Sequence, residues 1–325
     1  MTSSQDLLIA TTDRLVKRNR SSGNDRADRL FRYGIYGLGG ISVVILLSMA
    51  WTIFGRALPA IEQFGLGFLV GKEWNVPDIR FGALPVIYGT LGSGLIALLI
   101  AVPVGLSVAI ITSEDLLPQR VRTVIAFMVE LIAAIPSVIF GLWGFYTLVP
   151  LIRPIQSFLY TNFGGFPLFS TEPSGFGLMT AGVLLAIMIL PTLAAVSREV
   201  LLVVPTYLRT SSMALGATRW ETIFRVVLPT AFSGIIGGVM LALGRALGET
   251  MAVTMVIGNA ATIGPSIFEA AYSIPAILAN QFAEAQDDVH VGALSYLSLI
   301  LFVLTLAVNI GAILLVKLVQ SGGKK

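Results

Sequence analysis

Six long apolar segments alternate with shorter polar stretches along the chain. They cover residues 34–57, 86–112, 123–152, 177–196, 232–257 and 294–316. A helix needs about 20 mostly apolar residues to cross the hydrocarbon layer of a membrane, and each segment can supply that length. All six are too long and too uniformly apolar for barrel strands, which alternate over about ten residues. The pattern predicts an all-α integral membrane protein with six transmembrane helices.

The stretches between these segments predict how the chain is divided. Residues 1–33 are polar and rich in Ser and Arg, so we expect a cytoplasmic N-terminal tail. Residues 34–57 form the first transmembrane helix, residues 58–85 an external loop, and residues 86–319 the remaining membrane domain. A cleavable signal peptide is the alternative for the opening. Its apolar region would span about 7–15 residues, which is shorter than the run found here.

The amino-acid composition excludes several classes of function. Hydrophobic residues make up 55% of the 325 residues and charged residues only 12%, against about 25% charged in soluble domains. A soluble globular enzyme is therefore excluded. Cysteine is absent and His290 is the single histidine. Disulfide scaffolds, thiolate metal sites and cysteine nucleophiles are excluded, and we expect no metal site.

Lysine and arginine are distributed asymmetrically between the two sides that these helices define. Sixteen lie in the N-terminal tail, the second and fourth connections and the C-terminus, and four lie in the opposite loops. The connection between the fifth and sixth segments has no Lys or Arg but several acidic residues. Because basic residues favour the cytoplasmic side, both termini are predicted to be cytoplasmic.

Three ionisable residues remain at membrane depth: Arg245, Glu249 and Glu130. A charge at the bilayer centre costs about 2.5–3.5 kcal/mol on insertion scales, so such residues are expected to face the protein interior. Arg245 and Glu249 are four residues apart, which predicts that they share one helix face. A guanidinium suits an oxyanion bidentately, so this face could line a polar path. The alternative is an ion pair that only locks two helices together.

Proline interrupts three of the segments. Pro136 is predicted to kink the third, and Pro103 and Pro191 to act similarly in the second and fourth. Freed backbone groups are tolerated at membrane depth where they line a cavity. Ser137 and Glu130 are therefore candidate path residues. Glu130 could instead lie at the cytoplasmic boundary, and prolines are common in membrane helices in any case.

The cytoplasmic connection over residues 198–229 is far longer than an ordinary helix connection. Pro205 suits the start of a helix and Gly216 its end. Thr218 and Glu221 have the spacing of a capping box. A second helix is then predicted to carry on one face the apolar residues Trp220, Ile223, Phe224 and Val227. This connection could lie on lipid, or it could dock into a groove of a soluble partner.

This connection resembles the coupling-helix signature of type I ABC importer permeases, E-A-A-x3-G-x9-I-x-L-P. Gly216, Leu228 and Pro229 match the signature, and Val226 replaces its Ile. Thr210, Ser211 and Ser212 stand where the family has Glu-Ala-Ala. The resemblance implies a MetI-like bundle with a cytoplasmic coupling helix. It also implies a set of contacts to an ATPase: Ser211, Ser212, Gly216, Trp220, Glu221, Leu228 and Pro229.

Residues 130–144 and 244–254 look like the corresponding runs of the phosphate-specific importer permeases, in particular the PstC type. The resemblance implies import of inorganic phosphate across the bacterial inner membrane. We hypothesise that Arg245, Glu249, Glu130 and Ser137 lie along the phosphate path. The resemblance also implies a second permease of the PstA type, an ATP-binding dimer of the PstB type and an extracytoplasmic phosphate-binding protein of the PstS type. The sequence has no G-x-x-x-x-G-K-[ST] motif. We therefore expect the partner ATPase to bind ATP and Mg, with no cofactor in this chain.

Other functions remain open from the residues alone. The chain could be a permease for another oxyanion such as molybdate or sulfate. It could be an ion-coupled secondary transporter in which Glu130 and Glu249 titrate, in which case an uncoupler would abolish transport. It could also be a membrane scaffold that moves no substrate.

Overall fold

The computed structural model describes residues 24–322, and the chain divides into two units, Met1–Gly55 and Arg56–Lys325. The first unit contains most of α2 (Asn24–Phe64), an uninterrupted helix. Residues 24–33 are therefore helical, residues 1–23 lie outside the described residues, and the cytoplasmic tail over residues 1–33 stays a prediction. The helix continues into the second unit as far as Phe64, beyond the predicted end at residue 57.

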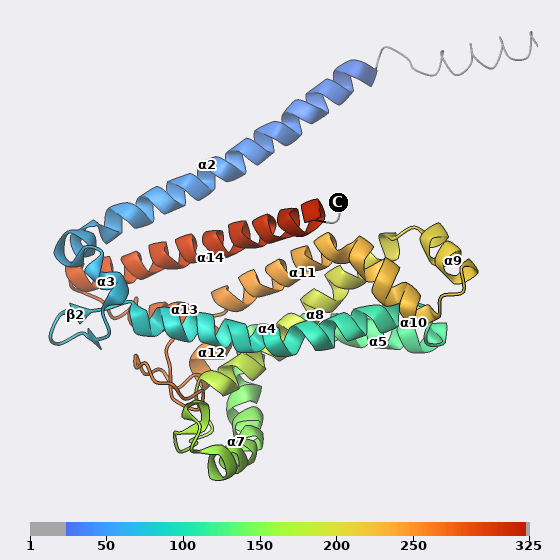
Figure 1. The fold of residues 1–325 in the computed structure, drawn as a ribbon. Helices are drawn as coiled ribbons and strands as arrows, with labels where there is room; N and C mark the ends of the chain where they lie inside the picture. Colours follow the sequence, from blue (N-terminus) through green and yellow to red (C-terminus); the bar gives the residue numbers. More distant parts are fainter. Residues whose placement is uncertain (1–23, 323–325) are drawn as a thin grey trace, which may run out of the picture. The chain divides into compact units, whose positions relative to one another are not determined.

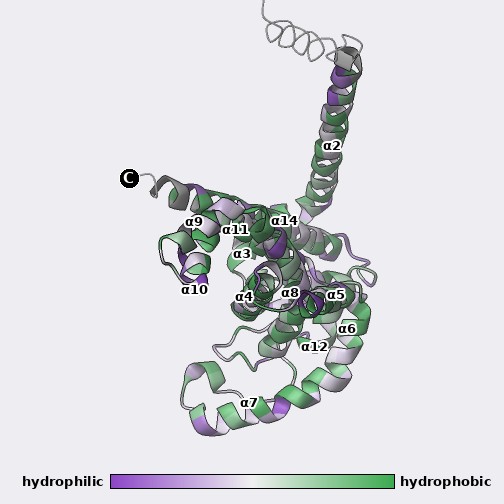
Figure 2. Cartoon of the chain, turned by 90° about the vertical axis from the view of Figure 1, so that its right-hand side faces the viewer, coloured by the Kyte–Doolittle hydropathy of each residue, from purple (hydrophilic) through white to green (hydrophobic). Residues whose placement is uncertain are grey.

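Six helices or helical runs within the described residues are long and apolar enough to cross a membrane, which confirms the predicted number. They are Asp28–Phe64, Leu84–Ser113, Ser137–Phe163, Leu178–Val203, Arg219–Gly248 and Asp288–Leu318. Figure 2 shows hydrophobic residues in the majority along these helices, with hydrophilic residues at the N-terminal end of α2. The fourth and sixth spans are longer than predicted because their helices continue beyond the apolar stretches of sequence on which the prediction rests.

The second unit is a helical bundle with one small hairpin (Figure 1). Its first half contains α3 (Gly67–Val70), β1 (Trp74–Asn75), β2 (Arg80–Phe81), α4 (Leu84–Ser113), α5 (Gln119–Ala133), α6 (Ser137–Trp143), the π-helical turn η1 (Gly144–Leu148), α7 (Val149–Phe163) and the 3-10 turn η2 (Pro167–Phe169). Its second half contains α8 (Leu178–Val203), α9 (Thr206–Ala214), α10 (Arg219–Thr222), the π-helical turn η3 (Ile223–Val227), α11 (Leu228–Gly248), α12 (Met251–Val256), α13 (Ile274–Gln281) and α14 (Asp288–Gly322). Strands β1 and β2 pair antiparallel, with Trp74 opposite Phe81.

The centre of this unit is the packing of α4 and α11 against α8. Small residues allow the helices to approach closely: a Cβ at Gly182 would lie 2.4 Å from Ile96 Cγ2. The main apolar cluster includes Leu184, Leu185 and Ile189 of α8, each at most 1% exposed. Since lipid tails are as apolar as leucine, tight packing rather than water exclusion holds such helices together.

Two further apolar clusters lie toward the opposite ends of the bundle. One joins α3, the hairpin and α14, where the rings of Phe68 and Tyr296 stack at 4.6 Å. The other joins the ends of α4 and α8 to η3 and α11, and includes Ile223 and Val227. Figure 1 shows the hairpin and the α9–α10 segment at opposite ends. Each end of the bundle thus has its own core.

The prolines of the second, third and fourth spans have different effects on their helices. The predicted third span, residues 123–152, is divided: α5 ends at Ala133, Pro136 precedes α6, and the membrane-length run is Ser137–Phe163. Pro136 thus breaks the helix rather than kinking it, because the residue before a proline disfavours helical backbone. By contrast, α4 and α8 continue through Pro103 and Pro191. These two helices are therefore not broken at proline, and the predicted kinks stay predictions.

The two π-helical turns share one cause. Turn η1 leads into Val149-Pro150 and turn η3 leads into Leu228-Pro229. A proline ring clashes with the carbonyl four residues earlier and donates no hydrogen bond to it. Widening the preceding turn to an i→i+5 pattern relieves that clash without ending the helix. The run from Arg219 to Gly248 therefore stays helical through Pro229.

Candidate functional site

The segment Thr206–Val227, called the coupling elbow below, has the predicted helix–glycine–helix form. Helix α9 follows Pro205 and gives way to Gly216, whose φ of +92° is open to glycine without strain. Thr218 and Glu221 form the predicted capping box, with the Thr218 N–H donating to Glu221 Oε2 at 2.8 Å. Local chemistry alone defines this turn, which is why the sequence predicted it.

The apolar residues after the cap do not share one face, so that prediction is wrong. Ile223 and Val227 are 2% and 0% exposed and pack into the core near the end of α8. Trp220 and Phe224 are 55% and 59% exposed, and their rings stack at 6.2 Å on the other side. One pair therefore anchors the elbow to the bundle, whereas the other remains available to a partner.

The remaining predicted coupling residues are distributed around this exposed aromatic pair. Ser211 is exposed, and Ser212 bridges α9 to α10 by a 3.0 Å hydrogen bond to Thr222 Oγ1. Leu228 is partly buried against the core at the start of α11, and Pro229 is exposed beside it. The elbow also exposes Leu215, at 89%. Such exposed apolar groups are typical of docking surfaces.

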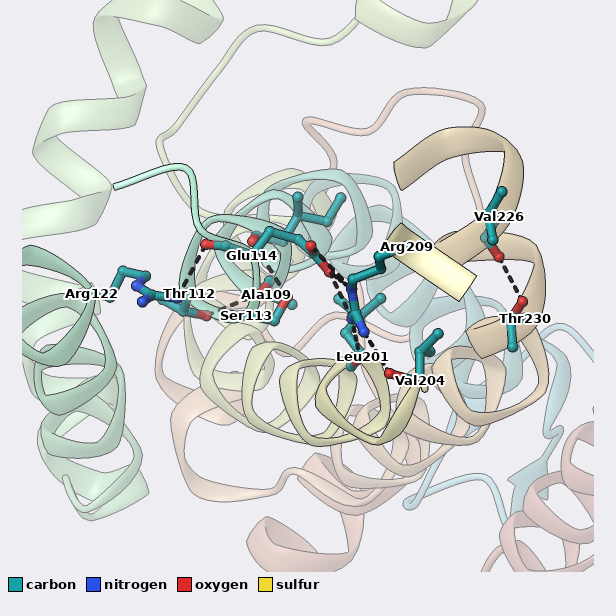
Figure 3. A network of polar contacts seen from close by, with 11 residues as sticks. Ala109, Thr112, Ser113, Glu114, Arg122, Leu201, Val204, Arg209, Val226 and Thr230 are labelled. Atoms are coloured by element: carbon teal, nitrogen blue, oxygen red, sulfur yellow. Dashed lines mark hydrogen bonds and ion pairs between the residues drawn. The ribbon is translucent and has the colours of Figure 1, made fainter. Parts of the chain in front are cut away.

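An ion pair ties the elbow to the preceding helices (Figure 3). Arg209 donates from Nη2 and Nε to Glu114, with N–O distances of 2.9–3.3 Å. The same guanidinium donates from Nη2 to the Leu201 carbonyl at 2.8 Å and from Nη1 to the Val204 carbonyl. Both charged side chains are largely buried, at 17% and 12% exposed. One side chain thus joins α9 to the C-terminal ends of α4 and α8.

The neighbouring Asp115 extends this connection to α5 and α10. Arg219 donates to the Asp115 carbonyl at 2.9 Å, and Arg122 of α5 pairs with the Asp115 carboxylate at 2.9 Å. Arg122 also donates to the Glu114 carbonyl at 3.3 Å. A pocket of about 140 Å³ lies within the network, lined by Glu114, Asp115, Leu116, Arg209, Met213, Arg219, Thr222 and Ile223. The predictions missed Glu114 and Asp115 because no motif marks a two-residue acidic loop.

The predicted pairing of Arg245 with Glu249 is wrong. Helix α11 ends at Gly248, and Glu249 has extended backbone with ψ of 125°, so the two side chains do not share a helix face. Arg245 instead donates from Nη1 to Thr192 Oγ1 of α8 at 3.1 Å. No ion pair joins Arg245 to a carboxylate within the described residues. The cation lies exposed on the surface of this chain.

Glu249 lies at a break in the fifth span. Its Oε1 accepts a hydrogen bond from the Ala252 N–H at 3.3 Å, which supports the first turn of α12. Helix α11 presents glycines to open space on the surface that carries Arg245: Gly237, Gly244 and Gly248 would meet nothing within 4 Å with a Cβ added. A charged side chain beside open glycines is poorly suited to lipid. This surface of α11 is therefore adapted to another protein or to an aqueous path.

Glu130 and Ser137 lie on either side of the break in the third span. Glu130 is exposed in the last turn of α5 and lines a cavity of about 50 Å³ that Arg198 of α8 also lines. The buried Nε of Arg198 makes no hydrogen bond within the described residues. Ser137 is the first residue of α6, after Pro136, and is half-buried. No hydrogen bond or ion pair joins Glu130 or Ser137 to Arg245 in the part of the chain that the structure describes.

The two broken spans meet at α6 and α12, which pack against each other. A Cβ at Gly141 of α6 would lie 2.6 Å from Met255 Sδ and 3.1 Å from Ala252 Cα. A side chain at this position would therefore force Met255 and the backbone of α12 to shift. Among the described residues, no group of three or more His, Cys, Asp or Glu side chains could hold a metal ion.

Comparison with known proteins identifies this architecture. Residues 101–322 match the family of the binding-protein-dependent transport system inner membrane component. The chain belongs to this family. It is 44% identical to the phosphate transport system permease protein PstC of Mesorhizobium japonicum, over 86% of each chain. It is 41% identical to the PstC protein of Xylella fastidiosa, over 92% of this chain and 93% of that one. This family member is therefore a multi-pass inner-membrane protein and a transport subunit.

A solved structure of the MetNI methionine ABC transporter in inward-facing conformations supports the fold assignment. It has a TM-score of 0.53 and 19% identity, and covers 76% of this chain and 99% of that chain. At that identity the likeness concerns the fold alone. The family member thus has the predicted fold of a type I ABC importer permease.

Proposed function

We propose that the chain is the membrane-spanning permease subunit of an ATP-driven importer of inorganic phosphate. The observation that carries the proposal is its 44% and 41% identity to phosphate transport permeases over most of its length. The surface of α11 supports it independently, because Arg245 offers a guanidinium fork at membrane depth beside open glycines. Both termini lie in the cytoplasm, as the distribution of Lys and Arg favours.

The partners follow from this role. A second permease of the PstA type covers the exposed surface of α11, a PstB-type dimer binds ATP and Mg and contacts the coupling elbow, and a PstS-type protein delivers phosphate from outside. The exposed rings of Trp220 and Phe224 are the centre of the ATPase contact, with Ser211, Leu215 and Pro229 around them. ATP hydrolysis belongs to the partner, since this sequence lacks a P-loop motif.

Transport then proceeds by alternating access, in which movement of the elbow rocks the bundle and opens the path to the outside. Arg245 stabilises the passing phosphate and is oriented by Thr192. Glu249 lies at the break between α11 and α12, where its negative charge limits how tightly the anion is held. Conduction requires binding that is strong enough for the ion to enter and weak enough for it to leave. Glu130 and Ser137 flank the other break and contribute polar groups nearer the α9–α10 end.

Reconstitution tests the proposal. The chain is purified with its membrane partners and inserted into vesicles that contain ATP, and labelled phosphate is supplied with the binding protein outside. Phosphate uptake that needs ATP and persists with an uncoupler is the expected result. Uptake that the uncoupler abolishes would contradict it, as would equal uptake of sulfate or molybdate presented with their own binding proteins. Co-purification from native membranes, with recovery of an ATPase and a second permease, tests the assembly separately.

A further inference from the structure

We propose that Arg209 and Glu114 are the positioning pair that transmits movement of the coupling elbow to the membrane helices. This inference rests on the proposed function, because it assumes that an ATPase moves the elbow. It goes further by assigning transmission to two residues, neither of which belongs to the predicted coupling surface.

Helix α9 needs such a connection because apolar packing holds it only weakly. None of its residues is fully buried, and Leu208 only partly packs against the core between α4, α8 and η3. The opposite arm of the elbow is anchored differently, by Ile223 and Val227 in that core. Besides the Arg209 contacts, α9 is held by its chain connections, by the partly buried Leu208 and by the hydrogen bond from Ser212 to Thr222.

The geometry of Arg209 suits a mechanical connection between three helices. Its guanidinium binds the Glu114 carboxylate at the end of α4, and the carbonyls of Leu201 and Val204 at the end of α8. The last carbonyls of a helix lack the usual i+4 partner, so the cation satisfies the Val204 carbonyl, adds a second donor to the Leu201 carbonyl that the Val204 N–H also reaches at 3.3 Å, and complements the helix dipole. A planar fork with five donors can serve these acceptors together, whereas a lysine ammonium acts as a point charge. Both side chains are more than four-fifths buried, which limits screening by salt.

The connection continues from Glu114 to α5 through its neighbour. Asp115 pairs with Arg122 of α5, and its carbonyl accepts from Arg219 of α10. Displacement of α9 therefore displaces the α4–α5 corner together with the end of α8. Because α5 is separated from α6 by the break at Pro136, the corner can move without dragging α6 directly.

The ratio of phosphate taken up to ATP hydrolysed tests whether Arg209 and Glu114 transmit the movement. In the complete reconstituted complex, Arg209→Gln and Glu114→Gln are each expected to lower phosphate taken up per ATP hydrolysed by about tenfold, the scale of one lost charge-assisted contact. The double variant should lose no more coupling than Arg209→Gln alone, because both substitutions remove the same connection. Arg209→Lys should not restore coupling. The matched control is the exposed pair Arg80–Glu73, 3.1 Å apart and 68% exposed on both side chains, whose Gln variants should behave as wild type.

A distance measurement separates transmission from mere stability. The chain has no cysteine, so spin labels can be placed at Leu117→Cys and Leu215→Cys, both exposed positions. In wild type the distance between the labels should stay the same with and without trapped ATP, because elbow and corner move together. In the Arg209→Gln variant it should change and broaden.

Three results would overturn the proposal: normal coupling in both single variants, additive losses in the double variant, or loss of the ATPase from purified variant complexes. The last would assign the pair to docking rather than transmission. A wild-type complex that took up no phosphate with ATP would instead contradict the proposed function. The two failures are therefore distinguishable.

Discussion

Arg245 of α11 and Thr192 of α8 are joined by a 3.1 Å hydrogen bond from Nη1 to Oγ1. This contact holds one edge of the guanidinium, and within the described residues its other donors make no hydrogen bond. An oxyanion path needs a cation that is held in place and still has unpaired hydrogen-bond donors. The contact with Thr192 also explains how Arg245 is held without Glu249.

Replacing Arg245 by alanine should abolish phosphate uptake while the complex still assembles. The loss is expected to reach about 10- to 100-fold, since a hydrogen bond to a charged group contributes about 1.5–3 kcal/mol. ATP-driven uptake in vesicles measures the effect, and co-purification of the subunits checks assembly. Arg80→Ala, which removes an exposed arginine of the hairpin, is the control. Normal uptake by the Arg245 variant would remove this residue from the path.

Gly216 is predicted to tolerate asparagine but not proline. Its φ of +92° lies in the region that glycine and, less readily, asparagine adopt, whereas proline is locked near −65°. A Cβ at this position meets no atom within 4 Å, so backbone conformation alone decides the result. Gly216→Pro should uncouple ATP hydrolysis from phosphate uptake, and Gly216→Asn should largely retain coupling. If the proline variant bound the ATPase and responded to it fully, the elbow would not be the coupling element.

Trp220 and Ile223 lie three residues apart in the elbow, but replacing them should affect different properties. The Trp220 variant should lose ATPase affinity, and the Ile223 variant should lose stability. Trp220→Ala removes an exposed ring, so affinity for the ATPase should fall by about 2 kcal/mol or more, as at other interface hot spots. Thermal unfolding should be unchanged. Ile223→Ala empties a site that is 2% exposed and should lower the free energy of unfolding by about 2–5 kcal/mol. Binding assays with the purified ATPase and melting curves in detergent separate the two, and a stability loss in Trp220→Ala would contradict the assignment.

Gly234 and Gly237 of α11 form a second matched pair. A Cβ at Gly234 would lie 2.4 Å from Val200 Cγ1, whereas a Cβ at Gly237 would meet nothing within 4 Å. Gly234→Ala should therefore destabilise the chain by about 1–3 kcal/mol through overpacking. Gly237→Ala should leave the isolated chain as stable as wild type but weaken its association with a second permease. Melting temperature and co-purification report the two effects, and an equal loss of stability in both variants would refute the distinction.

The number of spans and the form of the elbow could be predicted because local chemistry specifies them. Span number depends on apolar length, and the elbow depends on Gly216 and on the Thr218–Glu221 capping box. Both need only neighbouring residues.

The breaks depend on contacts between distant residues and were not predictable in the same way. No proline marks the break after Gly248; it accompanies the packing of α12 on α6 at Gly141. Three prolines look alike in the sequence, yet only Pro136 ends a helix, because α4 and α8 pack against each other along their lengths and remain helical. The position of Glu249 therefore had to come from tertiary structure, as did the partners of Arg209.

The contact at Gly141 has a consequence for how the bundle changes shape. The two interrupted spans touch at the segments that follow their breaks, α6 after Pro136 and α12 after Glu249. Because α6 and α12 are in close contact, a change of angle at either break displaces the segment that packs against the other span. We therefore expect the two spans to bend together when the bundle changes shape.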